Sequence, residues 1–209
     1  MKNILITGGA GFIGSRLCEK LYERDYNITV LDNLSEQIHG NKESDLFRRI
    51  KGISTFIKGD VRNREDWEKS IKGQDIVVHL AAETGTGQSM YEIERYNDVN
   101  IMGTSHLLKI LKDTDHSVKR IVLASSRAIY GEGKYNCLEH GIQYPLQRLS
   151  SDMENGDFNL KCQVCNKDII AIATDEKSKI HPFSIYGKTK QKQEEMIMLM
   201  GSRLKIPSI

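Results

Sequence analysis

Short apolar runs alternate with stretches of helical periodicity along most of this chain. Nearly continuous apolar runs of about four to eight residues are typical of strands covered on both faces. Strands that alternate with helices predict parallel βαβ units with right-handed crossovers. We therefore expect an α/β protein with a doubly wound parallel sheet. The predicted strands are Lys2–Thr7, Asn27–Leu31, Ser54–Ile57, Asp75–Ala82 and Arg120–Ser125.

Helical periodicity begins after the first strand, where Ile13, Leu17 and Leu21 are predicted to share one face. Two further helices are predicted, from Asn97 to Leu111 and from about Ser184 to Met200. The closing sequence "RLKIPSI" predicts the start of a sixth strand.

The alternation stops between residue 132 and about residue 176, a polar stretch that is punctuated by glycine and contains three of the four cysteines. We expect one domain formed by residues 1–131 and 177–209, with an insert at 132–176. The fourth cysteine, Cys18, falls among apolar positions of the first helix and is predicted to be in the core.

Composition narrows the functional classes. With 209 residues, 39% of them hydrophobic, the chain is long enough to form an ordinary core. A formal net charge of +2 offers no footprint for nucleic acid or for an anionic membrane. No run approaches the roughly 18 apolar residues of a membrane span, and the N-terminus has no signal-peptide pattern. Four cysteines make no disulfide scaffold, so we expect a cytoplasmic protein without nucleic-acid or membrane partners.

A glycine-rich turn joins the first strand to the first helix. In "TGGAGFIG", Gly8, Gly11 and Gly14 have the spacing for a tight turn, a close approach to a pyrophosphate and close helix–strand packing. The helix N-terminus adds free N–H groups and a partial positive charge. Asp32 ends the second strand, where its carboxylate can accept from a ribose 2′-OH; a surface-turn aspartate is the alternative. This pattern predicts a Rossmann-like site that prefers NAD to NADP.

A serine motif and a tyrosine–lysine pair supply candidate catalytic groups. "SSRAIYG" begins where the fifth strand ends, at the edge where open α/β sheets bind ligands. Tyr186 and Lys190 are four residues apart on a predicted helix, so both lie on one face. The lysine ammonium favours the phenolate, which makes the tyrosine a base. Such a pair alone is more often part of a solvated face, but the serine motif and the dinucleotide turn favour the catalytic interpretation.

Together, "TGGAGFIG", "HLAA", "NIMGT", the serine motif and Y-x-x-x-K resemble the extended short-chain dehydrogenase/reductase superfamily, and within it the NAD-dependent nucleotide-sugar epimerases and dehydratases. The resemblance covers essentially the whole chain outside the insert. Ser126, four residues before Tyr130, corresponds to the catalytic hydroxyl of the family. The resemblance implies that Tyr186 is the base, that Ser126 hydrogen-bonds the sugar hydroxyl and the phenol, and that Lys190 holds the nicotinamide ribose. The implied cofactor site comprises Gly8, Gly11, Phe12, Ile13, Gly14, Asp32, Asn33, Asp60, Val61, Leu80, Ala81, Ala82, Asn100, Tyr186 and Lys190.

The residues after Ser126 bear on the reaction. Dehydratases of the family follow the catalytic hydroxyl with an Asp–Glu pair, whereas this chain has Arg127 and Ala128, which cannot do that proton work. The resemblance therefore favours C4 epimerisation through a 4-keto sugar, with Tyr186 taking the 4-OH proton. A 2-epimerase, a dehydratase, a reductase and a catalytically silent NAD-binding fragment are the alternatives. Arg127 either contacts substrate or is an exposed or ion-paired side chain.

The insert carries a metal-ligand pattern, C-x2-H followed after 21 residues by C-x2-C. A turn residue follows each pair, Gly141 and Asn166, as a tight turn around a metal requires. Incidental thiols in a surface loop and a redox C-x-x-C are the alternatives. We predict a closed structural zinc site of zinc-ribbon type. Its ligands are Cys137, His140, Cys162 and Cys165.

The resemblance also implies partners. A comparable cysteine-bearing insert occurs in some bacterial sugar-nucleotide epimerases, which favours a UDP- or dTDP-sugar, and a deoxysugar in particular, as substrate. The family often dimerises through the helices that correspond to Asn97–Leu111 and Tyr186–Met200, so a homodimer is expected. Family members continue past the position of residue 209, and we expect their C-terminal substrate-binding part to lie outside these residues.

Overall fold

The computed structural model describes residues 2–40 and 44–209. The chain forms two compact units. The boundary between them falls inside helix α8 (Ile185–Leu204), so one continuous helix contributes to both. The first unit comprises Met1–Thr84, Glu92–Ser125 and Lys192–Ile209, and the second comprises Gly85–Tyr91 and Ser126–Gln191.

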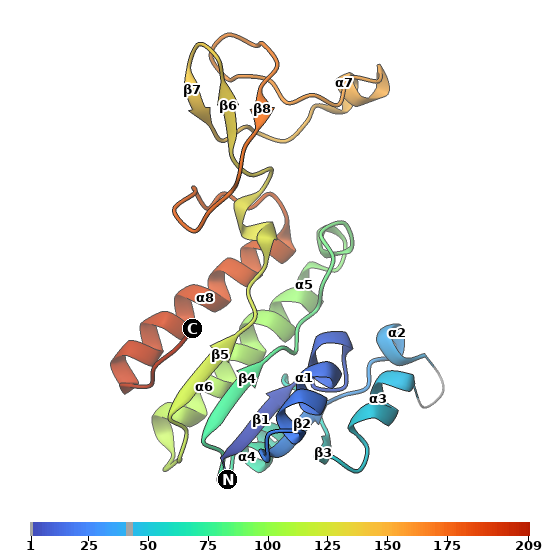
Figure 1. The fold of residues 1–209 in the computed structure, drawn as a ribbon, viewed down its shortest axis with the longest axis vertical. Helices are drawn as coiled ribbons and strands as arrows, with labels where there is room; N and C mark the ends of the chain where they lie inside the picture. Colours follow the sequence, from blue (N-terminus) through green and yellow to red (C-terminus); the bar gives the residue numbers. More distant parts are fainter. Residues whose placement is uncertain (1, 41–43) are drawn as a thin grey trace. The chain divides into compact units, whose positions relative to one another are not determined.

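A five-stranded parallel sheet forms the centre of the first unit (Figure 1). The strand order is β3-β2-β1-β4-β5, so the connection reverses direction beside β1, as the doubly wound prediction requires. Thr7, at the end of β1, pairs with both Leu31 and His79, which brings the ends of three strands to one edge. The strands are β1 (Asn3–Thr7), β2 (Asn27–Asp32), β3 (Thr55–Lys58), β4 (Ile76–His79) and β5 (Arg120–Leu123).

Helices cover both faces of this sheet because alternate strand residues point to opposite sides. Leu5 packs into a cluster with residues of α4, α6 and α8, whereas Ile4 and Ile6 pack into a second cluster with α1 and α3. The helical elements of this unit are α1 (Phe12–Tyr22), α2 (Glu36–His39), α3 (Asp45–Ile50), α4 (Arg64–Ser70), α5 (Ile93–Tyr96), the π-helical η2 (Asn97–Met102) and α6 (Gly103–Asp113), with the C-terminal part of α8.

Several predicted elements differ from the structure at their ends. The fourth strand is shorter than Asp75–Ala82, because the chain leaves the sheet after His79. The helix predicted from Asn97 is helical throughout, but it begins with the π-helical turn η2. The last helix extends to Leu204, so only the final residues approach β5, where the Ile121 N–H donates to the Pro207 carbonyl at 3.0 Å.

The buried face of α1 agrees with the prediction except at Ile13. Cys18 is fully buried, as predicted, and Leu17 and Leu21 are partly buried, but the Ile13 side chain is 65% exposed. The residues buried in the first turn are Gly14 and Ser15, and Gly14 lies directly against the glycine turn. Ile13 lies outside this face and remains exposed.

The second unit contains a three-stranded antiparallel sheet of order β7-β6-β8. Its hydrophobic cluster holds only four buried residues, Cys137, Leu160, Cys162 and Ile169, two of which are predicted metal ligands. Its elements are η1 (Gln88–Met90), η3 (Arg127–Tyr130), β6 (Tyr135–Cys137), β7 (Gly141–Gln143), α7 (Ser150–Glu154), β8 (Ile170–Ala171) and the first turns of α8. Among the residues that the structure describes, no helix is sufficiently long and apolar to span a membrane.

Candidate functional site

The glycine turn packs directly on the chain that leaves β4. Gly8 has a φ of +69°, and a Cβ at this position would lie 2.7 Å from the Ala81 nitrogen. The Thr7 hydroxyl accepts from the Ala81 N–H at 3.2 Å and so joins the same two segments. The predicted cofactor residues Leu80, Ala81 and Ala82 therefore lie beside the glycine turn.

Gly14 brings the start of α1 against the glycine turn. A Cβ on Gly14 would lie 2.4 Å from the Gly8 carbonyl oxygen, whereas a Cβ on Gly11 would meet the same oxygen at 3.2 Å. Gly14 thus has the packing role that the spacing predicts. Phe12 and Ile13, both predicted cofactor contacts, are 76% and 65% exposed at the open N-terminus of the helix.

Asp32 lies next to this turn. Its carboxylate accepts from the Ala10 N–H at 3.0 Å and from the Leu34 N–H at 2.9 Å. A carboxylate at the end of β2 can accept from an NAD ribose hydroxyl, and the adjacent helix N-terminus offers N–H donors to the pyrophosphate. The residues present therefore fit the dinucleotide.

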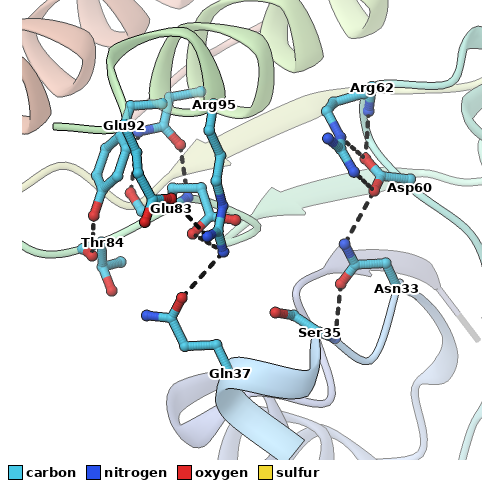
Figure 2. A network of polar contacts seen from close by, with 11 residues as sticks. Asn33, Ser35, Gln37, Asp60, Arg62, Glu83, Thr84, Glu92 and Arg95 are labelled. Atoms are coloured by element: carbon cyan, nitrogen blue, oxygen red, sulfur yellow. Dashed lines mark hydrogen bonds and ion pairs between the residues drawn. The ribbon is translucent and has the colours of Figure 1, made fainter. Parts of the chain in front are cut away.

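Asn33 and Asp60, predicted at the cofactor, meet after β2 and β3 (Figure 2). The Asn33 amide donates to the Asp60 carboxylate at 3.0 Å, and two Arg62 nitrogens donate to it at 3.0 and 2.7 Å. Partial burial opposes ionisation of Asp60, but the hydrogen bonds from Arg62 and Asn33 outweigh it and lower the pKa of Asp60 to about 2. Asp60 is thus a carboxylate at neutral pH. Val61 has its side chain in the core, and its carbonyl accepts from the Trp67 indole at 2.8 Å.

A second polar cluster, centred on Arg95, was not predicted (Figure 2). Arg95 contacts the carboxylates of Glu83 and Glu92 at 2.9 and 2.7 Å and donates to Gln37 at 3.1 Å. Asn100 is fully buried and hydrogen-bonds both the N–H and the carbonyl of Glu83, at 2.9 and 3.1 Å. Asn100, a predicted cofactor residue, therefore holds the loop after β4. The Glu92 pair is a local i,i+3 contact, but no local sequence signal identifies the contacts with Glu83 and Gln37, because these partners come from separate segments.

A chain of buried hydrogen bonds runs through the first unit beneath this edge. The Thr7 hydroxyl lies 2.7 Å from His79 Nδ1, and His79 Nε2 lies 3.1 Å from the Thr104 hydroxyl. Gln193, on α8, donates to the same hydroxyl at 2.7 Å. All four side chains are at most 1% exposed. The histidine of "HLAA" and the threonine of "NIMGT" thus connect β1, β4, α6 and α8.

The predicted catalytic residues lie in the second unit. Ser126 caps η3, its hydroxyl accepting from the Ala128 N–H at 3.1 Å. Helix α8 approaches this segment at Gly187, where a Cβ would lie 2.7 Å from the Ala128 carbonyl oxygen. Tyr186 precedes this glycine and is half-buried, and Lys190 follows one turn later and is buried. The structure therefore brings the serine segment against the helical turn that carries Tyr186 and Lys190.

The predicted metal ligands also converge. The ligand atoms of Cys137, His140, Cys162 and Cys165 lie within 4.8 Å of one another. Cys137 Sγ lies 3.8 Å from Cys165 Sγ and 3.6 Å from His140 Nδ1, and Cys162 Sγ lies 3.7 Å from His140 Nδ1. A tetrahedron with zinc bonds of about 2.3 Å to sulfur and about 2.1 Å to nitrogen has edges of about 3.8 and 3.6 Å. The donor set fits zinc.

The backbone around these ligands has the form that the sequence predicts. Gly141 and Asn166, the residues after the two ligand pairs, have φ values of +67° and +59°. The backbone N–H of Glu139, with the His140 ring and further hydrogen bonds, lowers the pKa of the Cys137 thiol to about 6 despite the opposing effect of burial. All four cysteines of the chain are free of disulfides.

Comparison with known proteins identifies the class. The model of the NAD dependent epimerase/dehydratase family matches residues 4–151, and the chain belongs to this family. A dTDP-L-rhamnose 4-epimerase of Burkholderia thailandensis is 35% identical over 208 residues, which cover 99% of this chain and 55% of that protein. The chain thus spans about half the length of this relative.

Solved structures agree on the fold. The UDP-glucose 4-epimerase of Thermotoga maritima, solved with UDP-glucose, matches with a TM-score of 0.71 and 27% identity. The match covers 99% of this chain and 53% of the epimerase chain. The UDP-glucuronic acid 4-epimerase of Bacillus cereus, solved with UDP-glucuronic acid and NAD, matches with a TM-score of 0.70 and 25% identity. The match covers 99% of this chain and 55% of the epimerase chain. The Rossmann-like doubly wound sheet predicted from the sequence is confirmed.

Proposed function

We propose that this chain is the cofactor-binding and catalytic part of an NAD-dependent nucleotide-sugar 4-epimerase. The observation that carries the proposal is the contact of α8 with η3 at Gly187, which places Ser126 and Tyr186 on adjoining segments. The glycine turn, Asp32 and the "HLAA" segment, which pack together, support NAD as the cofactor. The named 4-epimerases among the relatives support the reaction at C4.

The chain's own residues move the proton. Tyr186 accepts the proton of the sugar 4-OH, while Ser126 hydrogen-bonds the same hydroxyl and the phenol. Lys190, one turn along the same face, stabilises the phenolate and binds the nicotinamide ribose. When bound, NAD supplies a reversible hydride acceptor. Arg127 and Ala128, which follow Ser126, carry no carboxylate for eliminating water.

The substrate we propose is a UDP- or dTDP-sugar, with a deoxysugar nucleotide favoured. The match to the dTDP-L-rhamnose 4-epimerase supports this choice because it extends through the insert, over 99% of the chain. A putative UDP-glucose 4-epimerase of Methanocaldococcus jannaschii, at 36% identity, covers only 70% of the chain.

We also propose that residues 132–176 form a zinc-stabilised insert in a domain made of residues 1–131 and 177–209. The four converging ligand atoms support it, and they leave no open coordination position for chemistry. Metal analysis should find about one zinc per chain, and Cys162→Ser should lose it. Cys18→Ala, a substitution in the first unit, should keep the zinc. Protein purified without chelator and free of metal would refute this assignment.

The reaction is tested by proton NMR of the protein with NAD and a panel of UDP-, dTDP-, GDP- and CDP-sugars. We expect a new anomeric signal with the C4 coupling pattern inverted. Tyr186→Phe should abolish it while NAD still binds, and Tyr22→Phe, at the exposed end of α1, should leave it unchanged. Equal behaviour of wild type and Tyr186→Phe on every sugar, with NAD bound, would instead identify a silent NAD-binding module.

A further inference from the structure

An aromatic ladder joins the insert to the segment that enters α8. The Tyr144 ring, just after β7, packs edge-on against the His181 ring with centroids 5.6 Å apart. The His181 ring packs in the same manner on Phe183, at 5.4 Å. Phe183 is three residues before Tyr186. Edge-to-face pairs of this kind stabilise a contact beyond the area that they bury.

The segment that enters α8, residues 181–184, also contacts the chain in and after η3. The His181 N–H donates to the Ile129 carbonyl at 2.9 Å, and a Cβ on Gly131 would lie 2.5 Å from the His181 carbonyl oxygen. His181 Nδ1 donates to the Lys179 carbonyl at 2.9 Å, while its Nε2 is buried and makes no hydrogen bond among the described residues.

The other end of the ladder leads to the metal ligands. Gln163, which directly follows the ligand Cys162, donates from its side chain to the Tyr144 carbonyl at 3.2 Å. Gln147 donates to the Phe183 carbonyl at 3.4 Å and so joins the insert to the entering segment a second time. The contacts therefore run without a break from the ligand pair Cys162–Cys165 to the residues before Tyr186.

We propose that the metal-bound insert braces the first turn of α8 through Tyr144, His181 and Phe183, which act as positioning residues for Tyr186. The inference rests on the proposed zinc site and deepens it. The insert has only four buried cluster residues of its own, so the metal supplies the rigidity that Tyr144 transmits. Removing the metal loosens the entry to α8 even though no ligand lies on that helix.

The test is amide hydrogen exchange of the segment 181–190 by mass spectrometry, with zinc content measured on each sample. Treating the zinc-loaded wild type with a chelator should speed exchange of this segment roughly two- to tenfold, the range expected for losing an aromatic pair. Tyr144→Ala should do the same while keeping its zinc. Tyr144→Phe keeps the aromatic ring and should exchange like wild type. Ile142→Ala, a substitution at an exposed position of β7, should also exchange like wild type.

The outcomes separate this inference from the proposed function. A wild-type protein that binds no zinc would overturn both the metal site and the brace. Bound zinc with unchanged exchange in Tyr144→Ala, or after chelation, would overturn the brace alone. Exchange at Leu107–Leu111 of α6, in the first unit, should stay constant throughout; a parallel rise there would mean general unfolding and would also contradict the proposal. Sugar turnover takes no part in the readout, so the epimerase proposal is judged separately.

Discussion

At the scale of the residue, two glycines, Gly14 in the first turn and Gly87 before η1, differ in the space around their Cα atoms. A Cβ on Gly14 would be 2.4 Å from a backbone oxygen that is fixed by the turn, so neither partner can move aside easily. Gly87 has a φ of −66° and open space around it. Replacing glycine by alanine is therefore expected to destabilise the fold at Gly14 and to be tolerated at Gly87.

Gly14→Ala should lower the free energy of unfolding by about 1–3 kcal/mol, as overpacking does, and should weaken NAD binding because α1 is displaced from the turn. Gly87→Ala is the control and should be neutral or slightly stabilising. Urea unfolding and NAD titration measure both quantities. A Gly14→Ala protein with wild-type stability would contradict the packing role.

Asp60 gives a prediction for pH. Its pKa is lowered in the folded state to about 2, from 3.8, through the hydrogen bonds of Arg62 and Asn33 that outweigh partial burial. A depressed carboxyl pKa stabilises the folded state above the unfolded value, and the contribution is lost as pH falls from about 4 towards 2. The difference in unfolding free energy between wild type and Asp60→Asn should therefore shrink across that window. A difference that stays constant between pH 7 and pH 3 would refute the shift.

The sequence was sufficient to locate most of these residues but not their contacts. The spacing of the glycines and the position of Asp32 follow from the strand–turn–helix pattern, and the structure has them together. The exposure of Ile13 was missed because periodicity marks apolar positions without showing that Gly14 and Ser15 occupy the buried face. The contacts of Arg95 with Glu83 and Gln37 depend on segments far apart in the chain and leave no local pattern.

At the scale of the element, α8 is held by polar as well as apolar contacts. Its C-terminal part buries Ile197 in the core, and Gln193 reaches the Thr104 hydroxyl, which also lies beside His79 and donates to the Asn100 carbonyl at 2.7 Å. A fully buried polar chain of this kind is stable only while every member keeps its partner. The helix is thus fixed in register as well as in place.

Gln193→Leu should lower the free energy of unfolding by about 1–3 kcal/mol, because it removes a buried donor from Thr104. Lys192→Met, at the adjacent exposed position, should change it by less than about 1 kcal/mol since surface ion pairs contribute little. Thermal or urea unfolding of the two variants side by side is the measurement. Equal stability would show that the Gln193 hydrogen bond is dispensable.

Element types were predictable because the strands of a sheet covered on both faces are continuously apolar. The π-helical turn η2 and the short helix η3 were not, since a one-residue change in hydrogen-bond register leaves the apolar pattern nearly unchanged. The predicted start of a sixth strand in "RLKIPSI" lies too close to the helix, because residues 203–204 continue α8 and only the residues after Ile206 bond to β5.

At the scale of the whole molecule, the two units have separate hydrophobic clusters. Both large clusters belong to the first unit, and the small cluster of the second contains metal ligands. The loss of apolar rhythm predicts an insert at 132–176, whereas the second unit also includes Gly85–Tyr91 and the first turns of α8, which no sequence pattern indicates. Those segments are distant in sequence and are assigned by their packing.

The homodimer remains a prediction. The helices that the resemblance implies at the interface carry exposed apolar side chains: Met102, Met198 and Leu199 are 47%, 55% and 58% exposed. We expect a dimer in sedimentation at micromolar concentration, and Met198→Asp should yield the monomer because it places a charge in an apolar interface. Ile38→Asp, at an exposed apolar residue of α2, should leave the dimer intact. A wild type that sediments as a monomer would refute the prediction.

Because Cys18 is buried, the number of cysteines that react with an alkylating reagent can report whether a chain carries metal. Burial raises the pKa of the Cys18 thiol to about 12, so this sulfur stays protonated and out of reach of alkylating reagents. The other three cysteines all belong to the second unit. Cys137 and Cys162 are also buried in the folded insert, so they become accessible only where loss of the metal unfolds the insert. We therefore expect an alkylating reagent to leave metal-loaded chains unlabelled and to add three adducts to each metal-free chain whose insert has unfolded. One intact-mass spectrum would then give the fraction of chains that carry metal, without any assay of turnover.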